Sequence, residues 1–251
     1  MNFRQKLLRR ETLVGTMITL PSPEVVEIMV DLGFDWLFID CEHAPFDSRV
    51  AQSLLQAAGD RCPCVIRVPC GQDVWIKKML DIGAAGIIVP QVNSPEQAYL
   101  AIQSCKYPPQ GTRGVGLGRA HRYGAKFSEY LNNANNDIAV ILQAEHIDAV
   151  HCIDEITSLP GIDAILIGPY DLSASLGKTG NVDDPEVVEA IDKVRDTCLK
   201  REIPLGYFGV SPAAVKPYME QGYTLITVGV DVLFARSSAA DALGALRKPG
   251  E

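Results

Sequence analysis

The sequence contains no apolar run long enough to cross a membrane, and residues 1–11 mix four basic side chains with a few apolar ones. A secretory signal or a membrane anchor needs a continuous apolar segment, so we expect a cytoplasmic protein without membrane contact. Basic charge is also scarce, with 23 Lys and Arg against 31 Asp and Glu residues and a formal net charge of −8. Proteins that bind nucleic acid carry a basic face, so that class is not expected.

Several chemical motifs are missing as well. The chain has no Gly-x-Ser-x-Gly nucleophile elbow and no Walker phosphate loop. Its seven cysteines are an odd number, and only one residue separates Cys62 from Cys64. Redox and zinc pairs have two residues between their cysteines. The cysteines are therefore expected to be reduced thiols.

A repeated pattern is the most informative feature that is present. Four segments begin with glycine after a helical pattern, continue as apolar residues and end at a loop residue: 33–40, 83–90, 161–168 and 222–229. Glycine suits the end of a helix, and a continuous apolar run is typical of a strand buried on both faces. Four more strands are predicted at Val14–Thr19, Cys64–Val68, Ile138–Gln143 and Ile203–Phe208.

The spacing of these strands predicts the fold. Helical patterns such as Ser22–Leu32 and Pro185–Arg201 separate them, so eight parallel strands should close into a (β/α)8 TIM barrel. An open, doubly wound sheet is the alternative, but Thr19–Ser22 stands where its glycine-rich phosphate turn would lie. We expect one domain, residues 1–251, with an N-terminal helix at about 2–11 that caps the barrel bottom.

Catalytic side chains of such barrels lie where the strands end, at the C-terminal face. The strand ends of this chain carry His43, Arg67, Gln143, Glu145, Gly168, Tyr170 and Asp171. We predict that these residues come from separate strands to one mouth. Gln143, Gly168, Tyr170 and Asp171 are assigned to substrate contacts there.

Glu145 and Asp171 are the predicted metal ligands. Two carboxylates that face one cavity repel each other unless a cation lies between them, and oxygen ligands suit Mg²⁺ or Mn²⁺; Co²⁺ and Zn²⁺ remain alternatives. The other interpretation is that either carboxylate only caps a neighbouring helix. No predicted strand contains lysine, whereas imine chemistry requires a desolvated lysine. Negative charge in a reaction must then be stabilised by a metal ion and arginine.

Arg67 and His43 are the remaining candidates for chemistry. Arg67 is placed to hold the keto oxygen of a 2-oxo acid, where negative charge grows as an enolate forms; its alternative role is a structural ion pair. His43 is the predicted general acid and base, oriented by Asp81, and its alternative role is also structural.

The connection of residues 107–123 is long and rich in glycine and arginine. Such loops are usually functional or disordered. Its arginines, Arg113, Arg119 and Arg122, are expected to supply positive charge for an anionic substrate, unless the loop is only a solvated surface segment.

Motifs along nearly the whole chain, from Gly15 to about Ala239, resemble those of the class II pyruvate aldolases. This family includes 4-hydroxy-2-oxoheptanedioate, 2-dehydro-3-deoxyglucarate and 2-keto-3-deoxyrhamnonate aldolases. The motifs, in order, are Gly33-Phe-Asp-Trp36, Asp40-Cys-Glu-His43-Ala-Pro45, Arg67-Val-Pro69, Leu80-Asp-Ile-Gly-Ala84, Tyr107-Pro-Pro-Gln-Gly-Thr-Arg-Gly114, Gln143-Ala-Glu145 and Ile167-Gly-Pro-Tyr-Asp-Leu-Ser173.

The resemblance implies a barrel of the phosphoenolpyruvate/pyruvate type that reversibly cleaves a 4-hydroxy-2-oxo acid to pyruvate and an aldehyde. It implies a divalent metal on Glu145 and Asp171, Arg67 at the enolate oxygen, and His43 steadied by Asp81. It also implies a hexamer, a dimer of trimers, with C-terminal helices at about Asp231–Leu246 exchanged between subunits.

Four residues depart from the family pattern: Cys41, Ala144, His146 and Tyr170. The identity of the aldehyde therefore stays open. The alternative functions are oxaloacetate decarboxylation or a citrate-lyase-like acyl cleavage on the same scaffold, and a barrel that binds a metabolite without catalysis.

Overall fold

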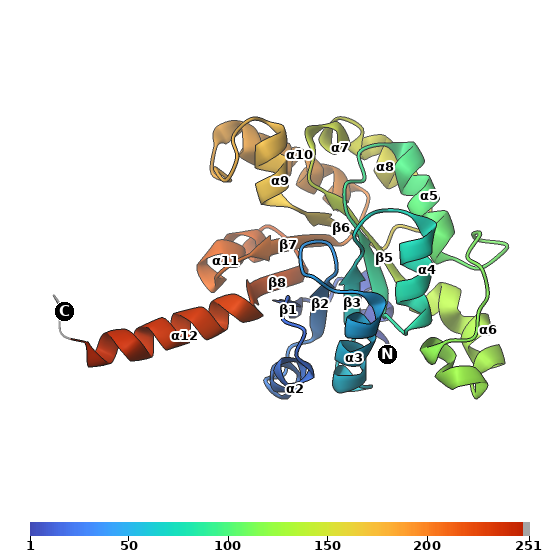
Figure 1. The fold of residues 1–251 in the computed structure, drawn as a ribbon. Coiled ribbons are helices and arrows are strands. Elements are labelled where there is room, and N and C mark those ends of the chain that lie inside the picture. The colour runs from blue at the N-terminus through green and yellow to red at the C-terminus, as the bar shows by residue number, and fades with distance from the viewer. Residues whose placement is uncertain (248–251) are drawn as a thin grey trace.

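Eight parallel strands close into a barrel in chain order in the computed structural model, which describes residues 1–247 (Figure 1). Each strand pairs with the next, and β8 pairs with β1. The strands are β1 (Leu13–Ile18), β2 (Trp36–Asp40), β3 (Cys64–Arg67), β4 (Gly86–Val89), β5 (Ala139–Ala144), β6 (Ala164–Ile167), β7 (Leu205–Gly209) and β8 (Leu225–Val230). The predicted (β/α)8 barrel is confirmed.

Helices lie outside the strands and connect them (Figure 1). They are α1 (Phe3–Leu8), α2 (Pro23–Asp31), α3 (Ser48–Ala58), α4 (Asp73–Asp81), α5 (Pro95–Cys105), the 3₁₀ helix η1 (Arg119–Gly124), α6 (Phe127–Asp137), α7 (Ile147–His151), α8 (Ile153–Ser158), α9 (Pro169–Ser175), α10 (Pro185–Lys200), α11 (Pro212–Glu220) and α12 (Asp231–Leu246). The predicted helices at Ser22–Leu32 and Pro185–Arg201 are α2 and α10.

Local sequence explains where several of these helices begin. In α2, α5, α10 and α11, proline is the first residue, and the Ser or Asp before it accepts a backbone N–H of the first turn. A side-chain oxygen at this position satisfies a free N–H group, and proline fits the first turn because its missing N–H would have no partner there.

The four glycines that open the repeated segments all have positive φ, at Gly33, Gly83, Gly161 and Gly222. This left-handed conformation ends a helix, and glycine adopts it without a steric penalty. Each glycine is followed within a few residues by a buried strand. The repeat therefore marks helix-to-strand junctions, as its pattern predicts.

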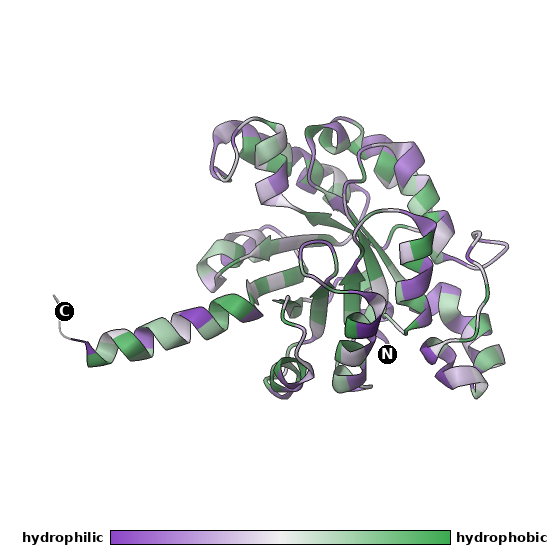
Figure 2. Ribbon diagram, in the orientation of Figure 1, coloured by the Kyte–Doolittle hydropathy of each residue, from purple (hydrophilic) through white to green (hydrophobic). Residues whose placement is uncertain are grey.

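Apolar side chains fill both faces of the strands, and Figure 2 shows mostly hydrophobic colour along the barrel. The cluster inside the barrel includes Trp36, Phe38, Ile141 and Leu166. Phe3 and Leu7 of α1 belong to the same cluster, and the Phe3 ring lies 5.8 Å from that of Trp36. Helix α1 thus packs directly against the barrel interior at the N-terminal ends of the strands.

Helix α12 differs from the others because it projects away from the barrel (Figure 1). Asp231 is its only buried residue. The carboxylate of Asp231 accepts the Thr19 hydroxyl at 2.7 Å and the Leu20 backbone N–H at 2.8 Å, so the base of α12 is tied to the loop after β1. Within residues 1–247, no helix has the length and apolar character needed to cross a membrane.

The packing of α1 gives a test of the barrel core. Leu7 is 0% exposed, whereas its neighbour Leu8 is 45% exposed. We expect Leu7→Ala to lower the free energy of unfolding by about 2–5 kcal/mol, because it leaves a cavity in a packed interior. Leu8→Ala should change it by about 0.5 kcal/mol or less. Urea unfolding followed by circular dichroism would measure both, and equal effects would contradict this packing.

Candidate active site

Strand register places Asp40 beside Arg67 at the C-terminal end of the barrel. The two residues are partners in the β2–β3 pairing. The Asp40 carboxylate accepts hydrogen bonds from Arg67 Nε at 2.9 Å and Nη2 at 2.8 Å. Asp40 also accepts the backbone N–H groups of Glu42 and His43. One buried carboxylate therefore fixes both the guanidinium and the turn that carries the histidine.

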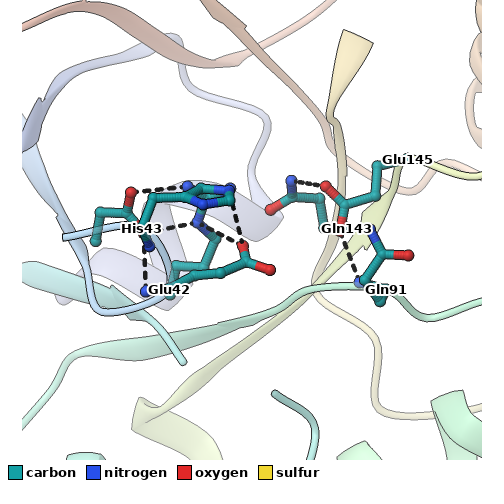
Figure 3. Close-up of polar contacts among 7 residues, drawn as sticks. Glu42, His43, Gln91, Gln143 and Glu145 are labelled. Atoms are coloured by element: carbon teal, nitrogen blue, oxygen red, sulfur yellow. Dashed lines mark hydrogen bonds and ion pairs between the residues drawn. The ribbon is translucent and has the colours of Figure 1, made fainter. Parts of the chain in front are cut away.

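Glu42 and His43 extend from that turn. Glu42 Oε2 lies 3.2 Å from Arg67 Nε and 3.8 Å from His43 Nε2, as Figure 3 shows for the Glu42–His43 pair. The His43 side chain is 65% exposed. Arg67 is thus an ion-pair partner of two carboxylates, and its Nη1 atom is left without a hydrogen bond in the described chain.

Glu145 follows β5 directly and is almost completely buried. Its Oε1 atom accepts the backbone N–H of Gln91 at 2.7 Å, and its Oε2 atom accepts the side-chain amide of Gln143. Figure 3 shows the carboxylate between these two donors. A Cβ atom at Gly168 would lie 2.7 Å from that of Glu145, so the absence of a side chain at the end of β6 makes room for the glutamate.

A cavity of about 310 Å³ opens at this end of the barrel. Its apolar walls include Met17, Phe38, Leu166 and Phe208, and its other walls include Thr19, Asp40, His43, Arg67, Gln143, Gly168, Tyr170 and Asp171. All the residues predicted at the mouth line this cavity except Glu145, which is buried beside Gln143. Asp171, in the first turn of α9, brings another carboxylate to the cavity.

The charges around the cavity are unbalanced. The pKa of Glu145 is raised from the ordinary 4.5 to about 7, mainly by burial. The charges of Glu42 and Asp171 also raise it, against the lowering effects of the Gln91 hydrogen bond and the Arg67 charge. Burial also raises the pKa of Glu42, and the negative charges of Asp40 and Asp171 add to this increase. Arg67 is the only cationic side chain that lines the cavity besides the titratable His43.

These residues fit a divalent cation. Glu145 follows β5 and Asp171 lines the cavity at the same end of the barrel, and both present carboxylate oxygens, the donors that Mg²⁺ and Mn²⁺ prefer. The buried oxygen Gln143 Oε1, on a residue that lines the cavity, has no hydrogen-bond donor in the described chain, so it remains available as an acceptor. Across residues 1–247, no three His, Cys, Asp or Glu side chains cluster as a ready-made metal site. Two protein ligands would leave the remaining coordination positions to water and substrate.

Asp81 does not contact His43 within the chain, which corrects the expected pairing. It is the last residue of α4, which follows β3 and returns toward the N-terminal end of the barrel. Its carboxylate lies 2.7 Å from Nη2 of the buried Arg113. Asp81 therefore stands at the end of the barrel opposite the cavity.

The three loop arginines are also absent from the cavity lining. Arg113 stacks on Tyr107 and Tyr130, Arg119 donates to the carbonyls of Ile82 and Leu55, and Arg122 pairs with Asp60. The expectation that they supply positive charge to the substrate is not met within one chain. Their contacts instead tie the loop to the helices beneath it, so the segment is not simply a solvated loop either.

Three residues of this site carry no role in the sequence-based prediction: Asp40, Glu42 and Gln91. The position of Asp40 opposite Arg67 follows from aligning the ends of β2 and β3, so this signal was available. Glu42 stands in the same turn as His43 and could have been included on charge alone. Gln91 acts through its backbone, and its residue type gives no sign of this.

Comparisons with known proteins agree with the fold. The sequence profile of the HpcH/HpaI aldolase/citrate lyase family matches residues 14–238. The chain is 35% identical to the hydroxypyruvate/pyruvate aldolase of Cupriavidus necator, over 98% of this chain and 92% of the relative. It is 35% identical to the 5-keto-4-deoxy-D-glucarate aldolase of Escherichia coli K12, over 94% of this chain and 93% of the relative.

A solved structure of the same family has the same fold. An HpcH/HpaI aldolase/citrate lyase family protein from Burkholderia cenocepacia superposes with a TM-score of 0.94 at 35% identity, and 98% of each chain is covered. The similarity therefore extends over the whole barrel and its C-terminal helix.

The raised pKa of Glu145 predicts how stability depends on pH. The folded-state pKa of about 7 lies above the ordinary 4.5, so this group's contribution is fully present below about pH 4.5 and is lost as pH rises through 7. Glu145→Gln is neutral throughout. In chelator-treated protein, we compare the free energy of unfolding of the variant with that of the wild type. The difference should shift in favour of the variant by roughly 1–3 kcal/mol as the pH rises from 5 to 8.

Urea unfolding of both proteins at the two pH values would measure this gain. Any hydrogen bond lost in the amide is lost at both pH values and cancels in the comparison. If the difference in unfolding free energy between variant and wild type is the same at both pH values, ionisation of Glu145 does not destabilise the fold.

Proposed function

Because the chain belongs to the HpcH/HpaI aldolase/citrate lyase family, we propose that this aldolase reversibly cleaves a 4-hydroxy-2-oxo acid to pyruvate and an aldehyde, with a divalent metal ion. The observation that carries the proposal is the buried, doubly hydrogen-bonded carboxylate of Glu145 at the end of β5, with the Asp171 carboxylate lining the cavity at the same end of the barrel. Its relatives are named aldolases, which favours this reaction over oxaloacetate decarboxylation and acyl cleavage.

Glu145 and Asp171 are the proposed ligands of the metal, with Mg²⁺ or Mn²⁺ as the preferred ions. When bound, such an ion acts as a Lewis acid that holds the oxygens of the 2-oxo acid and stabilises negative charge on them. Gln143 and Gly168 border the same space. We propose that they contact the pyruvate portion, while Tyr170, which is half exposed at the rim, contacts the aldehyde portion.

Arg67 is proposed to stabilise the enolate oxygen of pyruvate. Asp40 and Glu42 hold its Nε and Nη2 atoms, so the side chain is fixed before substrate binds. Its free Nη1 is then available to donate to an oxygen on which negative charge develops. A donor that is already oriented stabilises this charge without a cost for reorganisation.

His43 is proposed as the acid and base. It would take a proton from the pyruvate methyl group in one direction and protonate the aldehyde oxygen as the carbon–carbon bond forms. The neighbouring Glu42 carboxylate lies 3.8 Å from its Nε2 atom. If Asp81 also orients His43, that aspartate must come from another subunit, because Asp81 of the same chain lies at the opposite end of the barrel.

A hexamer, arranged as a dimer of trimers with exchanged C-terminal helices, is proposed for the assembly. Helix α12 projects from the barrel, and Val232, Leu233, Phe234, Leu243 and Leu246 are exposed along it. An apolar helix surface of this kind is typical of an interface. We also propose a cytoplasmic location, because all seven cysteines are free thiols; cell fractionation would test it.

The assembly has a direct test. Leu243→Asp places a charge on the exposed apolar surface of α12, so we expect a smaller oligomer by light scattering coupled to gel filtration. Asp241→Asn, on the same helix, removes a charge and serves as the control. An unchanged mass for Leu243→Asp, or a monomeric wild-type protein, would contradict an assembly through α12.

The central chemical test is exchange of the pyruvate methyl protons with deuterated water, which needs no aldehyde. We expect exchange in the presence of Mg²⁺ or Mn²⁺ and its loss after chelation, measured by proton NMR. Exchange that survives chelation and is blocked by borohydride would indicate an imine instead.

Two substitutions separate the proposed roles in the same assay. His43→Ala should reduce exchange by about 10²- to 10⁴-fold, the usual contribution of an acid/base group, with the affinity for metal retained. Glu145→Gln should lose both metal binding and exchange. Gln52→Ala, on the outer helix α3, is the control and should leave both unchanged.

A further inference from the structure

Gln91 has an unusual backbone conformation for its residue type. It follows β4 and Pro90, and its φ of +54° lies in the left-handed region. Residues with a Cβ atom adopt this region only rarely, because the side chain crowds the backbone. Among non-glycine residues of the described chain it is shared only with Arg10, Arg122, Tyr123 and Glu202.

The local packing shows what this conformation achieves. Pro90 and Val92 are both buried, whereas the side chain of Gln91 is exposed. The chain therefore turns inward on each side of Gln91 while its side chain points outward. The same turn aims the Gln91 backbone N–H at Glu145 Oε1, at 2.7 Å (Figure 3).

The second oxygen of Glu145 has its own donor. Oε2 accepts the Gln143 side-chain amide, which comes from the strand preceding the glutamate. A Cβ atom at Gly168 would be 2.8 Å from this oxygen and 2.8 Å from Gln143 Nε2. The carboxylate is thus held at two points and confined on a third side.

From this geometry we infer that Gln91 is a positioning residue, whose left-handed backbone directs an N–H group that fixes the Glu145 carboxylate for binding a divalent cation. The inference rests on the proposed function of Glu145 as a metal ligand. Groups that orient a metal ligand commonly change metal affinity when they are lost. Here the orienting group belongs to the backbone. The Gln91 side chain accepts only a hydrogen bond from the Asn93 side-chain amide at 3.3 Å, so the φ preference of residue 91 should matter more than its side-chain chemistry.

The test compares residues with different φ preferences at position 91. Glycine and asparagine adopt the left-handed region readily, whereas valine is a β-branched residue that strongly disfavours it. We expect Gln91→Gly and Gln91→Asn to bind Mn²⁺ as wild type does. Gln91→Val should bind it about tenfold or more weakly, with Gln91→Ala between them.

The measurement uses metal-stripped protein titrated with Mn²⁺, with free Mn²⁺ quantified by electron paramagnetic resonance. This readout needs no turnover. Circular dichroism and thermal unfolding of each variant identify the folded material, and Gln91→Ala provides the same comparison if Gln91→Val does not fold.

Glu202 offers a matched control. It has a φ of +62° in the turn after α10, where it pairs with Arg10 through exposed side chains. Glu202→Val imposes the same backbone conflict far from the cavity, so it should lower thermal stability and leave Mn²⁺ affinity unchanged. The exposed ion pair that it removes contributes little.

Each outcome has a defined meaning. Weak binding by Gln91→Val, normal binding by Gln91→Gly and normal binding by Glu202→Val support the inference. Wild-type affinity in folded Gln91→Val and Gln91→Ala, together with lost binding in Glu145→Gln, overturns the role of Gln91 and leaves the proposed function intact. Wild-type affinity in Glu145→Gln overturns both, because the metal would then bind elsewhere.

Discussion

The burial of the Glu145 carboxylate is the constraint around which the mouth of the barrel is organised. An ionised carboxylate loses favourable hydration when it is buried, and Glu42 and Asp171 add further negative charge nearby. Three neighbouring features accommodate it: a backbone N–H from Gln91, a side-chain amide from Gln143 and the missing side chain at Gly168. These features orient the carboxylate without neutralising it, which supports the proposed cation site.

Arg67 offsets only part of this charge, because it is also paired with Asp40 and Glu42. Asp40 at the end of β2 and Glu42 in the following turn hold the Arg67 side chain, and the mouth is thereby divided into two halves. One half, at Arg67, offers a fixed donor toward a developing negative charge. The other half, at Glu145 and Asp171, offers oxygen ligands. A 2-oxo acid carries a carboxylate and an adjacent keto group. A mouth with a donor in one half and oxygen ligands in the other has the parts needed to contact both groups.

The sequence predicts the barrel well because its signals are local. The repeated glycines adopt positive φ at helix ends, and the apolar segments that follow them are buried strands. The sequence pattern therefore marks the same helix-to-strand junctions as the structure. The gathering of His43, Arg67, Gln143 and Asp171 at one cavity follows from the same logic, because parallel strands of a barrel all end at one face.

The misassigned partners have a different origin. Residue type alone predicts the roles of Asp81 and the loop arginines, yet tertiary packing decides the partner of a charged side chain. Asp81 pairs with Arg113 at the end of α4, and Arg119 donates to helix-end carbonyls. Gln91 was missed because φ of a non-glycine residue leaves no mark in composition or periodicity. What the sequence does not reveal here is the set of contacts between elements that are distant along the chain.

The same contacts bear on how the acid/base group is controlled. His43 is mostly exposed in one chain, with a single carboxylate 3.8 Å away, whereas Arg67 and Glu145 are buried and hydrogen-bonded. A general base needs a fixed orientation toward the proton that it removes, and one chain does not provide this for His43.

Helix α12 extends an apolar surface away from its own barrel (Figure 1), and its first residue, Asp231, is hydrogen-bonded to Thr19 at the rim of the cavity. A neighbouring subunit docked through α12 would therefore lie close to the mouth of the cavity. The helix proposed as the interface, α12, and the residue that lacks an orienting partner, His43, are at the same end of the barrel. If the proposed assembly forms, the residues proposed to bind the metal and the enolate lie within one chain, whereas the orientation of His43 would depend on a neighbouring subunit.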